Sequence, residues 1–390
     1  MREPVDLRRQ RILAAVQARG TARVRDLAAE LQVSVVTVRR DVEELTREGR
    51  LLRGHGVVRS PVPVGEAPEG GPPDGDRVAV VVPARHSYLT ETLHGARTVL
   101  EEAGLRFALH LAPQADGAER PLVERALEDG ARGLLLAPRW RSLAAEEADY
   151  AWLAALEVPT VLMERRPRPG SAPHALDSVC SDHGYGAHLA VEHLVGLGHR
   201  RIVFATRDDS PTARSLRAAF ARIAGAHPLV EEWAWALSAP ESGQEGPYSA
   251  DETAELPALL RKVGATAVVL HGDVDAVMIV QRLAAEGVRV PEDCSVVAYD
   301  DVVAGLATPP LTAVAPPKGE VGRVAADLLL QRLQGVPGAG GAVRRVELLP
   351  RLMVRGSTRR IDDPDDDPGG APGNGSGSEL GNELGNASTE

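Results

Sequence analysis

Three polar side chains, Thr37, Arg39 and Arg40, lie on one side of a short amphipathic segment near the start of the chain. Ser34 comes just before this segment and is a typical helix N-cap, because its hydroxyl can accept a hydrogen bond from a later backbone N–H. Arginine pairs bidentately with guanine O6 and N7, so a helix with this face suits the major groove of DNA. We therefore predict that Thr37, Arg39 and Arg40, with Val36 beside them, contact DNA, and that Ser34 lies near a phosphate.

The opposite side of the same segment is apolar. Its apolar residues recur at helical spacing and predict the buried stripe of a helix: Val35, Val38, Val42 and Leu45. An alternative for the polar face is that Arg39 only pairs with Glu43 one helical turn later, which contributes about 0.3 kcal/mol.

Two helices are expected before this one and a hairpin after it. Residues 8–20 form an amphipathic stretch that ends in glycine, and residues 24–31 form a shorter one. After Gly49 the run RLLRGHGVV alternates as a short β-hairpin does. Arg53 and His55 on this hairpin are predicted to contact phosphates.

Charge is unevenly distributed along the chain. The net charge is -11, yet residues 1–60 carry 13 Arg and 8 acidic residues, whereas residues 361–390 carry 8 acidic residues and no Lys or Arg. A basic head on an acidic body is typical of a nucleic-acid-binding module joined to a second unit.

Composition divides the chain into four parts. Residues 60–76 are dominated by Pro and Gly and predict a flexible linker. Residues 361–390 are acidic and low in complexity, so we expect a disordered tail. A head at 1–59 and a body at 77–360 remain, and the length of 390 residues is consistent with at least two domains.

The body repeats a short apolar strand followed by a helix-length amphipathic segment. Strands that are apolar throughout and alternate with helices indicate parallel sheets buried on both faces, and the length favours two Rossmann-like lobes. Strands are expected at 77–83, 133–138, 158–164, 200–206, 265–271 and 294–300, and helices at 95–103, 143–156, 185–197, 213–223 and 276–286.

Several classes of protein are disfavoured. With 43% hydrophobic and 25% charged residues the chain is not disordered. No stretch approaches the about 18 apolar residues of a membrane span, and no export signal is visible, so we expect a cytoplasmic protein with no membrane partner. No nucleophile elbow, Walker loop or complete dinucleotide-binding fingerprint follows a strand. Two isolated cysteines, Cys180 and Cys294, and histidines without ligand spacing predict no metal and no cofactor.

The head resembles a known DNA-binding domain. The run VSVVTVRRDVEELTREGRLLRGHG, within the stretch from Leu7 to Val58, resembles the winged helix-turn-helix of DeoR-type bacterial transcription regulators. The resemblance implies binding to double-stranded operator DNA. Val57 and Val58 stand where that family usually has a glycine and a small residue, so the wing tip departs from the pattern.

The body resembles a different family. VEHLVGLGHRRIVF (191–204) and VRVPEDCSVVAYDDVVAGLATPPLTAV (288–314) resemble the effector-binding domain of LacI/GalR regulators, which is itself similar to periplasmic sugar-binding proteins. This resemblance implies two lobes joined by three crossovers, with a small-molecule effector between them. DeoR-type regulators usually carry a different sensor, so the chain is expected to be a hybrid.

The second resemblance implies five effector-binding residues. Tyr88 matches an aromatic that stacks on the effector, Arg214 matches a clamp on hydroxyls or a carboxylate, and Glu164, Asp273 and Asp300 match acceptors of sugar hydroxyls. Three of them have a structural alternative: Asp300 could end a strand, Glu164 could pair with its arginine neighbours, and Tyr88 could belong to the core. Gly272 and Ala137 depart from the family pattern, which leaves the effector open.

Together these features predict an α/β protein with an N-terminal winged helix-turn-helix and a two-lobed periplasmic-binding-protein fold. We expect a transcription regulator, most simply a repressor, that is a homodimer or a dimer of dimers and responds to a sugar. An enzyme or a ligand-binding protein with an incidental basic head is the alternative. The five prolines of the linker exclude an ordered hinge helix there, so the effector is expected to act by moving the two bodies of the dimer.

Overall fold

The computed structural model describes residues 8–9, 12, 16, 21–30, 33–47, 51–53, 57–59, 76–84, 88–238, 255–335 and 342–361. The linker predicted at 60–76 and the tail predicted at 361–390 lie outside these residues, apart from one residue at the edge of each.

The N-terminal domain combines helices with a small sheet. Helix α2 (Val24–Glu30) precedes α3 (Val35–Arg47), and residues 8, 9, 12 and 16 are helical as expected. Strands β2 (Leu52–Arg53) and β3 (Val57–Arg59) pair antiparallel, which confirms the hairpin, and β1 (Thr21–Arg23) adds to β3 as a third strand. The domain closes around its own apolar core: Ile12, Val16, Leu27, Val38, Val42, Leu45, Leu51 and Val58.

The first lobe of the body is a six-stranded sheet in the order β14-β8-β7-β6-β4-β5, with parallel pairing throughout. Its strands are β4 (Arg77–Pro83), β5 (Arg106–Ala112), β6 (Ala131–Leu136), β7 (Thr160–Met163), β8 (Asp177–Ser181) and β14 (Arg345–Leu348). Its helices are α4 (Leu89–Glu102), α5 (Glu119–Glu128), α6 (Leu143–Ala154) and α11 (Lys318–Leu333).

The side chains of β4 alternate between the two faces of the sheet, and helices cover both faces. Val78, Val80 and Val82 pack with α4 and α11, whereas Ala79 and Val81 pack with α5 and α6. A strand whose two faces are both buried reads as a continuous apolar run, which is why 77–83 was predictable.

The second lobe repeats the plan in the order β10-β9-β11-β12-β13-β15, parallel except for the last pair. Its strands are β9 (Arg201–Thr206), β10 (Glu232–Leu237), β11 (Ala267–His271), β12 (Ser295–Tyr299), β13 (Thr312–Ala315) and β15 (Arg351–Met353). Helices α7 (His183–Gly196) and α8 (Pro211–Ala226) cover one face, and α9 (Glu255–Val263) and α10 (Asp273–Ala285) the other.

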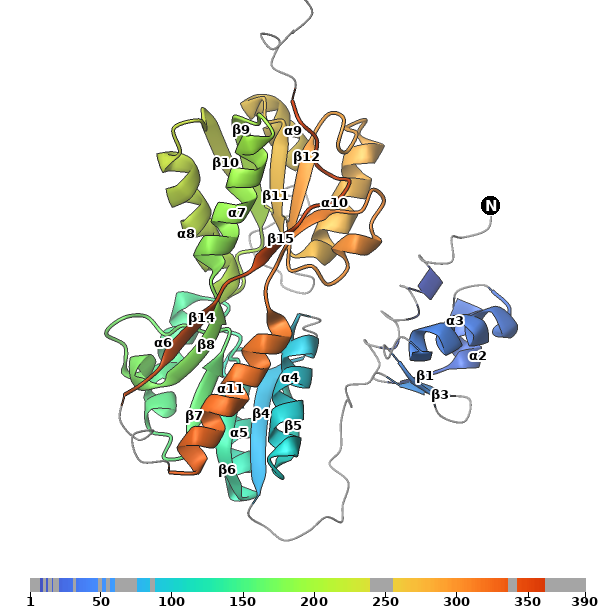
Figure 1. The fold of residues 1–390 in the computed structure, drawn as a ribbon. Helices are drawn as coiled ribbons and strands as arrows, with labels where there is room; N and C mark the ends of the chain where they lie inside the picture. The colour runs from blue at the N-terminus through green and yellow to red at the C-terminus, as the bar shows by residue number, and fades with distance from the viewer. Residues whose placement is uncertain are drawn as a thin grey trace, which may run out of the picture.

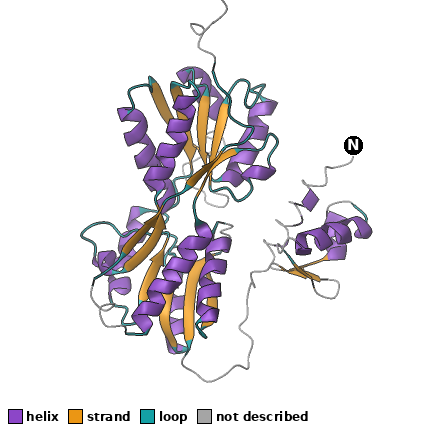
Figure 2. Cartoon of the chain, viewed as in Figure 1, coloured by secondary structure: helices purple, strands orange, loops and turns teal. Residues whose placement is uncertain are grey.

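The chain passes between the lobes three times, which confirms the predicted pair of lobes joined by three crossovers (Figure 1). The passages run from β8 to α7, from β13 to α11, and from β14 to β15. Figure 2 shows that helices flank the strands of both sheets. Because the carboxyl ends of β7, β8 and β12 lie close to these passages, the side chains that follow them meet at the junction of the lobes.

Helices α4 and α11 pack unusually closely over the first sheet. A Cβ atom on Gly322 would lie 1.8 Å from the backbone oxygen of Thr92, and one on Gly95 would lie 2.1 Å from the oxygen of Gly319. The absence of side chains at these two positions lets the helix after the second crossover lie directly on α4. Among the described residues, no helix has both the length and the apolar content needed to cross a membrane.

Candidate DNA-binding and effector-binding sites

Helix α3 presents the polar face that the sequence predicts. Val36 is 71% exposed and Arg39 and Arg40 are exposed, whereas Thr37 is half-buried. Ser34 is the N-cap: its Oγ accepts a hydrogen bond of 3.1 Å from the N–H of Thr37. The four residues from Val36 to Arg40 that were assigned to DNA thus lie on one short stretch of helix.

One member of the predicted buried stripe is misplaced. Val35 is 39% exposed, whereas the other three members are fully buried, so the stripe begins at Val38. Val35 lies in the first turn of α3, before the helix reaches the core of the domain.

A buried carboxylate anchors α3, and sequence reasoning did not single it out. The Asp41 carboxylate, 3% exposed as a residue, accepts hydrogen bonds from Nε of Arg8 at 2.6 Å and from Nε of Arg9 at 3.3 Å. These contacts tie α3 to the first helical residues of the chain. On the hairpin, Arg53 ends β2, and His55 lies outside the described residues.

At the junction of the lobes, polar side chains gather into what we call the inner cluster: Tyr88, Glu164, Ser181, His183, Tyr299, Asp300 and Lys318. Its centre is Glu164, which directly follows β7 and is 4% exposed. Glu164 Oε1 accepts from the hydroxyls of Tyr88 (2.7 Å) and Ser181 (2.8 Å), and Oε2 accepts from the backbone N–H of Ser181 (3.0 Å). Burial and the negative charges of Glu164 and Asp300 raise the pKa of Tyr88 well above 10.0, so its hydroxyl remains a donor.

His183 extends the cluster into the second lobe. Its Nδ1 lies 3.0 Å from the Tyr299 hydroxyl, and its Nε2 lies 3.8 Å from Glu164 Oε2. Burial lowers the pKa of His183, which opposes an ion pair with Glu164. On the far side of Tyr299, the Nδ1 of His271 lies 2.9 Å from the Thr206 hydroxyl, and burial lowers the pKa of His271 to about 4.

Asp300 follows β12 in a left-handed backbone conformation, with φ of 104°, and Glu164 has φ of 51°. Such values are uncommon for residues other than glycine and gather at functional sites. The Oδ1 atom of Asp300 is buried and has no hydrogen-bond partner. Burial and then the charge of Asp273 raise the pKa of Asp300 to about 8, against the lowering effect of Lys318.

Lys318 is the main member that sequence reasoning missed. It begins α11 at the second crossover and is only 3% exposed. Its Nζ donates to the backbone carbonyl of Asp300, lies 5.6 Å from the centre of the Tyr88 ring, and is 4.0 Å from Glu91 Oε1. The sequence signal for Lys318 was its position directly after the second Pro-Pro pair, which follows the strand in PPLTAV.

Asp273 is used differently from the other carboxylates. One of its oxygens accepts from the backbone N–H of Ala304 at 2.9 Å, and also from the N–H groups of Val302 and Val303. Asp273 therefore holds the loop that follows Asp300, in addition to any contact with a ligand.

Two ion pairs join the lobes beside the inner cluster, and we call them the lip pairs. Arg139 contacts Asp209 at 3.3 Å, and Arg214 contacts Glu146 at 3.3 Å. Arg214 also donates to the backbone oxygens of Trp140 (3.0 Å) and Arg141 (3.1 Å). The arginine expected to clamp the effector is thus bound by the opposite lobe, while Tyr88, Glu164 and Asp300 do come together.

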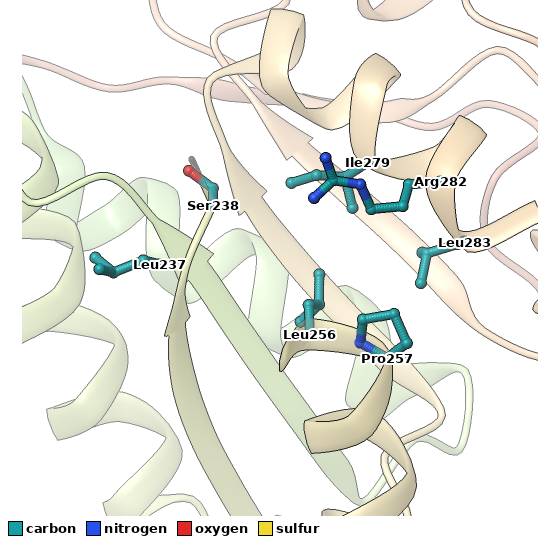
Figure 3. A pocket seen from close by; sticks show the side chains of 7 residues that line it. All are labelled: Leu237, Ser238, Leu256, Pro257, Ile279, Arg282 and Leu283. Atoms are coloured by element: carbon teal, nitrogen blue, oxygen red, sulfur yellow. The ribbon is translucent and has the colours of Figure 1, made fainter. Parts of the chain in front are cut away.

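A separate apolar hollow lies in the second lobe, between the end of β10 and helices α9 and α10 (Figure 3). It is lined by Leu237, Ser238, Leu256, Pro257, Ile279, Arg282 and Leu283. The chain between Ser238 and Glu255 lies outside the described residues. Within the described part of the chain, no group of His, Cys, Asp and Glu is arranged to hold a metal.

Comparison with protein families supports both halves of this reading. Residues 8–63 match the DeoR-like helix-turn-helix domain, and residues 191–358 match the periplasmic binding protein-like domain. Over 347 residues the chain is 29% identical to the arabinose metabolism transcriptional repressor of Geobacillus stearothermophilus, which covers 86% of this chain and 90% of that protein. The chain is a DNA-binding transcriptional regulator. It is not an enzyme.

Further relatives and solved structures are similar to part of this regulator. It is 30% identical over 210 residues to the HTH-type transcriptional repressor PurR of Haemophilus influenzae, and this match covers 52% of the regulator and only 58% of PurR. A LacI family regulator from Enterococcus faecium, solved with bound ribose, aligns over 73% of the regulator with 22% identity and a TM-score of 0.57. A lac repressor dimer bound to operator aligns over the same share with 22% identity and a TM-score of 0.58. These structural likenesses establish the two-lobed fold.

Proposed function

We propose that this regulator is a repressor that binds operator DNA through α3 and is controlled by a sugar held between the lobes of its body. The observation that carries the proposal is the inner cluster, in which Tyr88, Glu164 and Asp300 meet at the junction of the lobes. The arabinose metabolism repressor and the ribose-bound LacI family protein support a sugar as the class of effector.

The chemistry of the inner cluster suits a sugar. Carboxylates accept hydrogen bonds from neighbouring hydroxyls, and an aromatic ring packs against the C–H face of the sugar ring. Glu164 and Asp300 are the proposed acceptors and Tyr88 the proposed ring. Asp273 orients the Asp300 loop, and Arg214 is proposed to close the cleft over the effector.

In the DNA-binding domain, Thr37, Arg39 and Arg40 are the proposed base readers, with Val36 on the same face. Ser34, Arg53 and His55 are proposed to lie near phosphates. A single domain of this size buries too little DNA surface for tight specific binding, so we propose that a homodimer reads two half-sites.

The test uses the full chain and a duplex that it enriches from a random-sequence library. Arg39→Ala and Arg40→Ala should each lose about 1–3 kcal/mol of preference for that duplex over random DNA. Arg25→Ala is the matched control, because Arg25 is an exposed arginine on α2. It should leave the preference unchanged. Undiminished selectivity in both α3 variants would contradict the assignment of the recognition helix.

A further inference from the structure

Val36 is the most exposed large apolar side chain among the described residues, at 71%. It lies in the first turn of α3, one residue after Val35, which is 39% exposed and is spaced along the helix with the buried Val38 and Val42. A single apolar residue on a protein surface is common and needs no explanation by itself. The neighbours of Val36 on α3 therefore decide whether its exposure has a role.

Val36 lies on the same face of α3 as two exposed arginines. Arg39 and Arg40 follow it by three and four residues, the spacing at which side chains on a helix are neighbours. A rise of about 1.5 Å per residue places their Cα atoms about 4.5–6 Å further along the helix axis, which is less than two base-pair steps of about 3.4 Å. A helix that brings these arginines to base edges therefore carries Val36 into the same stretch of the major groove.

The first turn of α3 is held by a pair of hydroxyl groups. Ser34 Oγ accepts a hydrogen bond of 3.1 Å from the N–H of Thr37 and lies 2.8 Å from Thr37 Oγ1. These contacts cap the turn that contains Val36. In a helix the β-branched side chain of valine also keeps one strongly preferred χ1 rotamer. The isopropyl group of Val36 is therefore fixed in direction before DNA binds, and contact with a base costs little side-chain entropy.

The chemistry of a valine side chain distinguishes among the four bases. The isopropyl group has no hydrogen-bond donor or acceptor, so it cannot satisfy the acceptors and amino groups of a base edge. Thymine alone of the four presents a methyl group in the major groove, at C5. Contact between Val36 and that methyl removes apolar surface from water on both sides. Contact with a polar edge would instead desolvate polar groups without replacing their hydrogen bonds.

We propose that Val36 contacts the 5-methyl group of a thymine in the major groove, and that each half-site of the operator carries this thymine beside the bases read by Arg39 or Arg40. This inference rests on the proposed function above, because it uses α3 as the recognition helix. It adds a base preference that does not depend on hydrogen bonds.

The experiment removes the methyl group of thymine and leaves the rest of the base pair intact. In the duplex that the full chain enriches from a random-sequence library, each thymine is replaced in turn by uracil, and the Kd of each duplex is measured by fluorescence anisotropy. Because one buried methyl contact is lost, uracil opposite Val36 in one half-site should weaken binding by about fourfold.

Val36→Ala completes a double-mutant cycle with that replacement. The variant should bind the thymine and uracil duplexes with nearly equal affinity, because the contact is already lost. Val35→Ala changes the neighbouring valine in the same turn, is the matched control, and should keep the fourfold difference. An equal preference for thymine in Val36→Ala and in the unmodified chain would overturn the inference. A duplex in which no thymine is sensitive to replacement would also overturn it.

Two further measurements separate the possible failures. Binding to random DNA depends on phosphate contacts, so it should be unchanged in Val36→Ala and shows that the DNA-binding domain of the variant is folded. If Arg39→Ala and Arg40→Ala lose selectivity while Val36→Ala keeps the full preference for thymine, α3 is the recognition helix and this inference alone fails. If neither arginine variant loses selectivity, the assignment of α3 is wrong and this inference fails with it.

Discussion

The inner cluster and the lip pairs both lie between the lobes, but their polar groups are satisfied differently. In the inner cluster Asp300 keeps a buried oxygen without a partner, on a backbone with φ of 104°. In the lip pairs Arg214 finds Glu146 and two carbonyls on the opposite lobe. The difference supports the proposal that the inner cluster receives a ligand and that the Arg214 pair holds the lobes together.

The largest expected effect comes from Glu164. Glu164→Gln removes the charge from an acceptor of three hydrogen bonds and should lower the free energy of unfolding by about 2–3 kcal/mol. Denaturant unfolding followed by tryptophan fluorescence measures this in the body, since all four tryptophans lie there. Glu124→Gln, on an exposed pair with Arg120, should cost no more than about 0.5 kcal/mol. Equal losses in the two variants would remove the distinction between the inner cluster and the surface.

The next effect is a dependence on pH at His271, at the edge of the inner cluster. Burial lowers its pKa to about 4, so between pH 6.5 and 4 the unfolded chain binds a proton that the folded chain does not. Stability should therefore fall with falling pH, by about 2 kcal/mol from pH 7.5 to pH 5 for this group. His271→Gln lacks this contribution, so its unfolding free energy should fall less over the same range. Parallel pH curves for the two proteins would contradict the assignment.

The smallest effect concerns the lip pair of Arg214 and Glu146. A double-mutant cycle with Arg214→Gln and Glu146→Gln should give a coupling of about 1 kcal/mol, because Arg214 is 19% exposed and Glu146 is 5% exposed. If the pair only closes the lobes, each single variant should speed effector dissociation by a similar factor, about fivefold, in stopped-flow fluorescence. If Arg214 instead contacts the effector, Arg214→Gln should weaken effector binding and Glu146→Gln should not.

Local patterns explain how much of the fold was predictable. Strands buried on both faces, such as β4 and β9, are continuous apolar runs, and their positions were predicted to within one or two residues. Strand β10 was missed; it is an edge strand whose residues are all exposed or half-buried, although five of the six are apolar. Strand β1 was missed because three residues carry no period and depend on pairing with β3.

The candidate site was predictable where side chains directly follow strands. Glu164 and Asp300 both directly follow strands, and they were assigned through the resemblance to LacI/GalR regulators. Ser181, His183 and Lys318 were not, because their roles depend on partners from other crossovers that become neighbours only after the lobes assemble. The contacts of Arg214 could not be predicted for the same reason, because Glu146 is 68 residues earlier in the chain.

The central claim is that ligand binding in the body controls DNA binding by the head. The direct measurement is fluorescence anisotropy of the full chain on its enriched duplex, with and without a saturating concentration of a sugar that raises the Tm of the chain. The account predicts a change in DNA affinity of about 5–150-fold in the unmodified chain. Asp293→Ala, at an exposed carboxylate that pairs with Arg289, should respond like the unmodified chain, and Asp300→Ala should need a higher sugar concentration for the same change. A sugar that binds the body with unchanged DNA affinity in the unmodified chain would contradict the account.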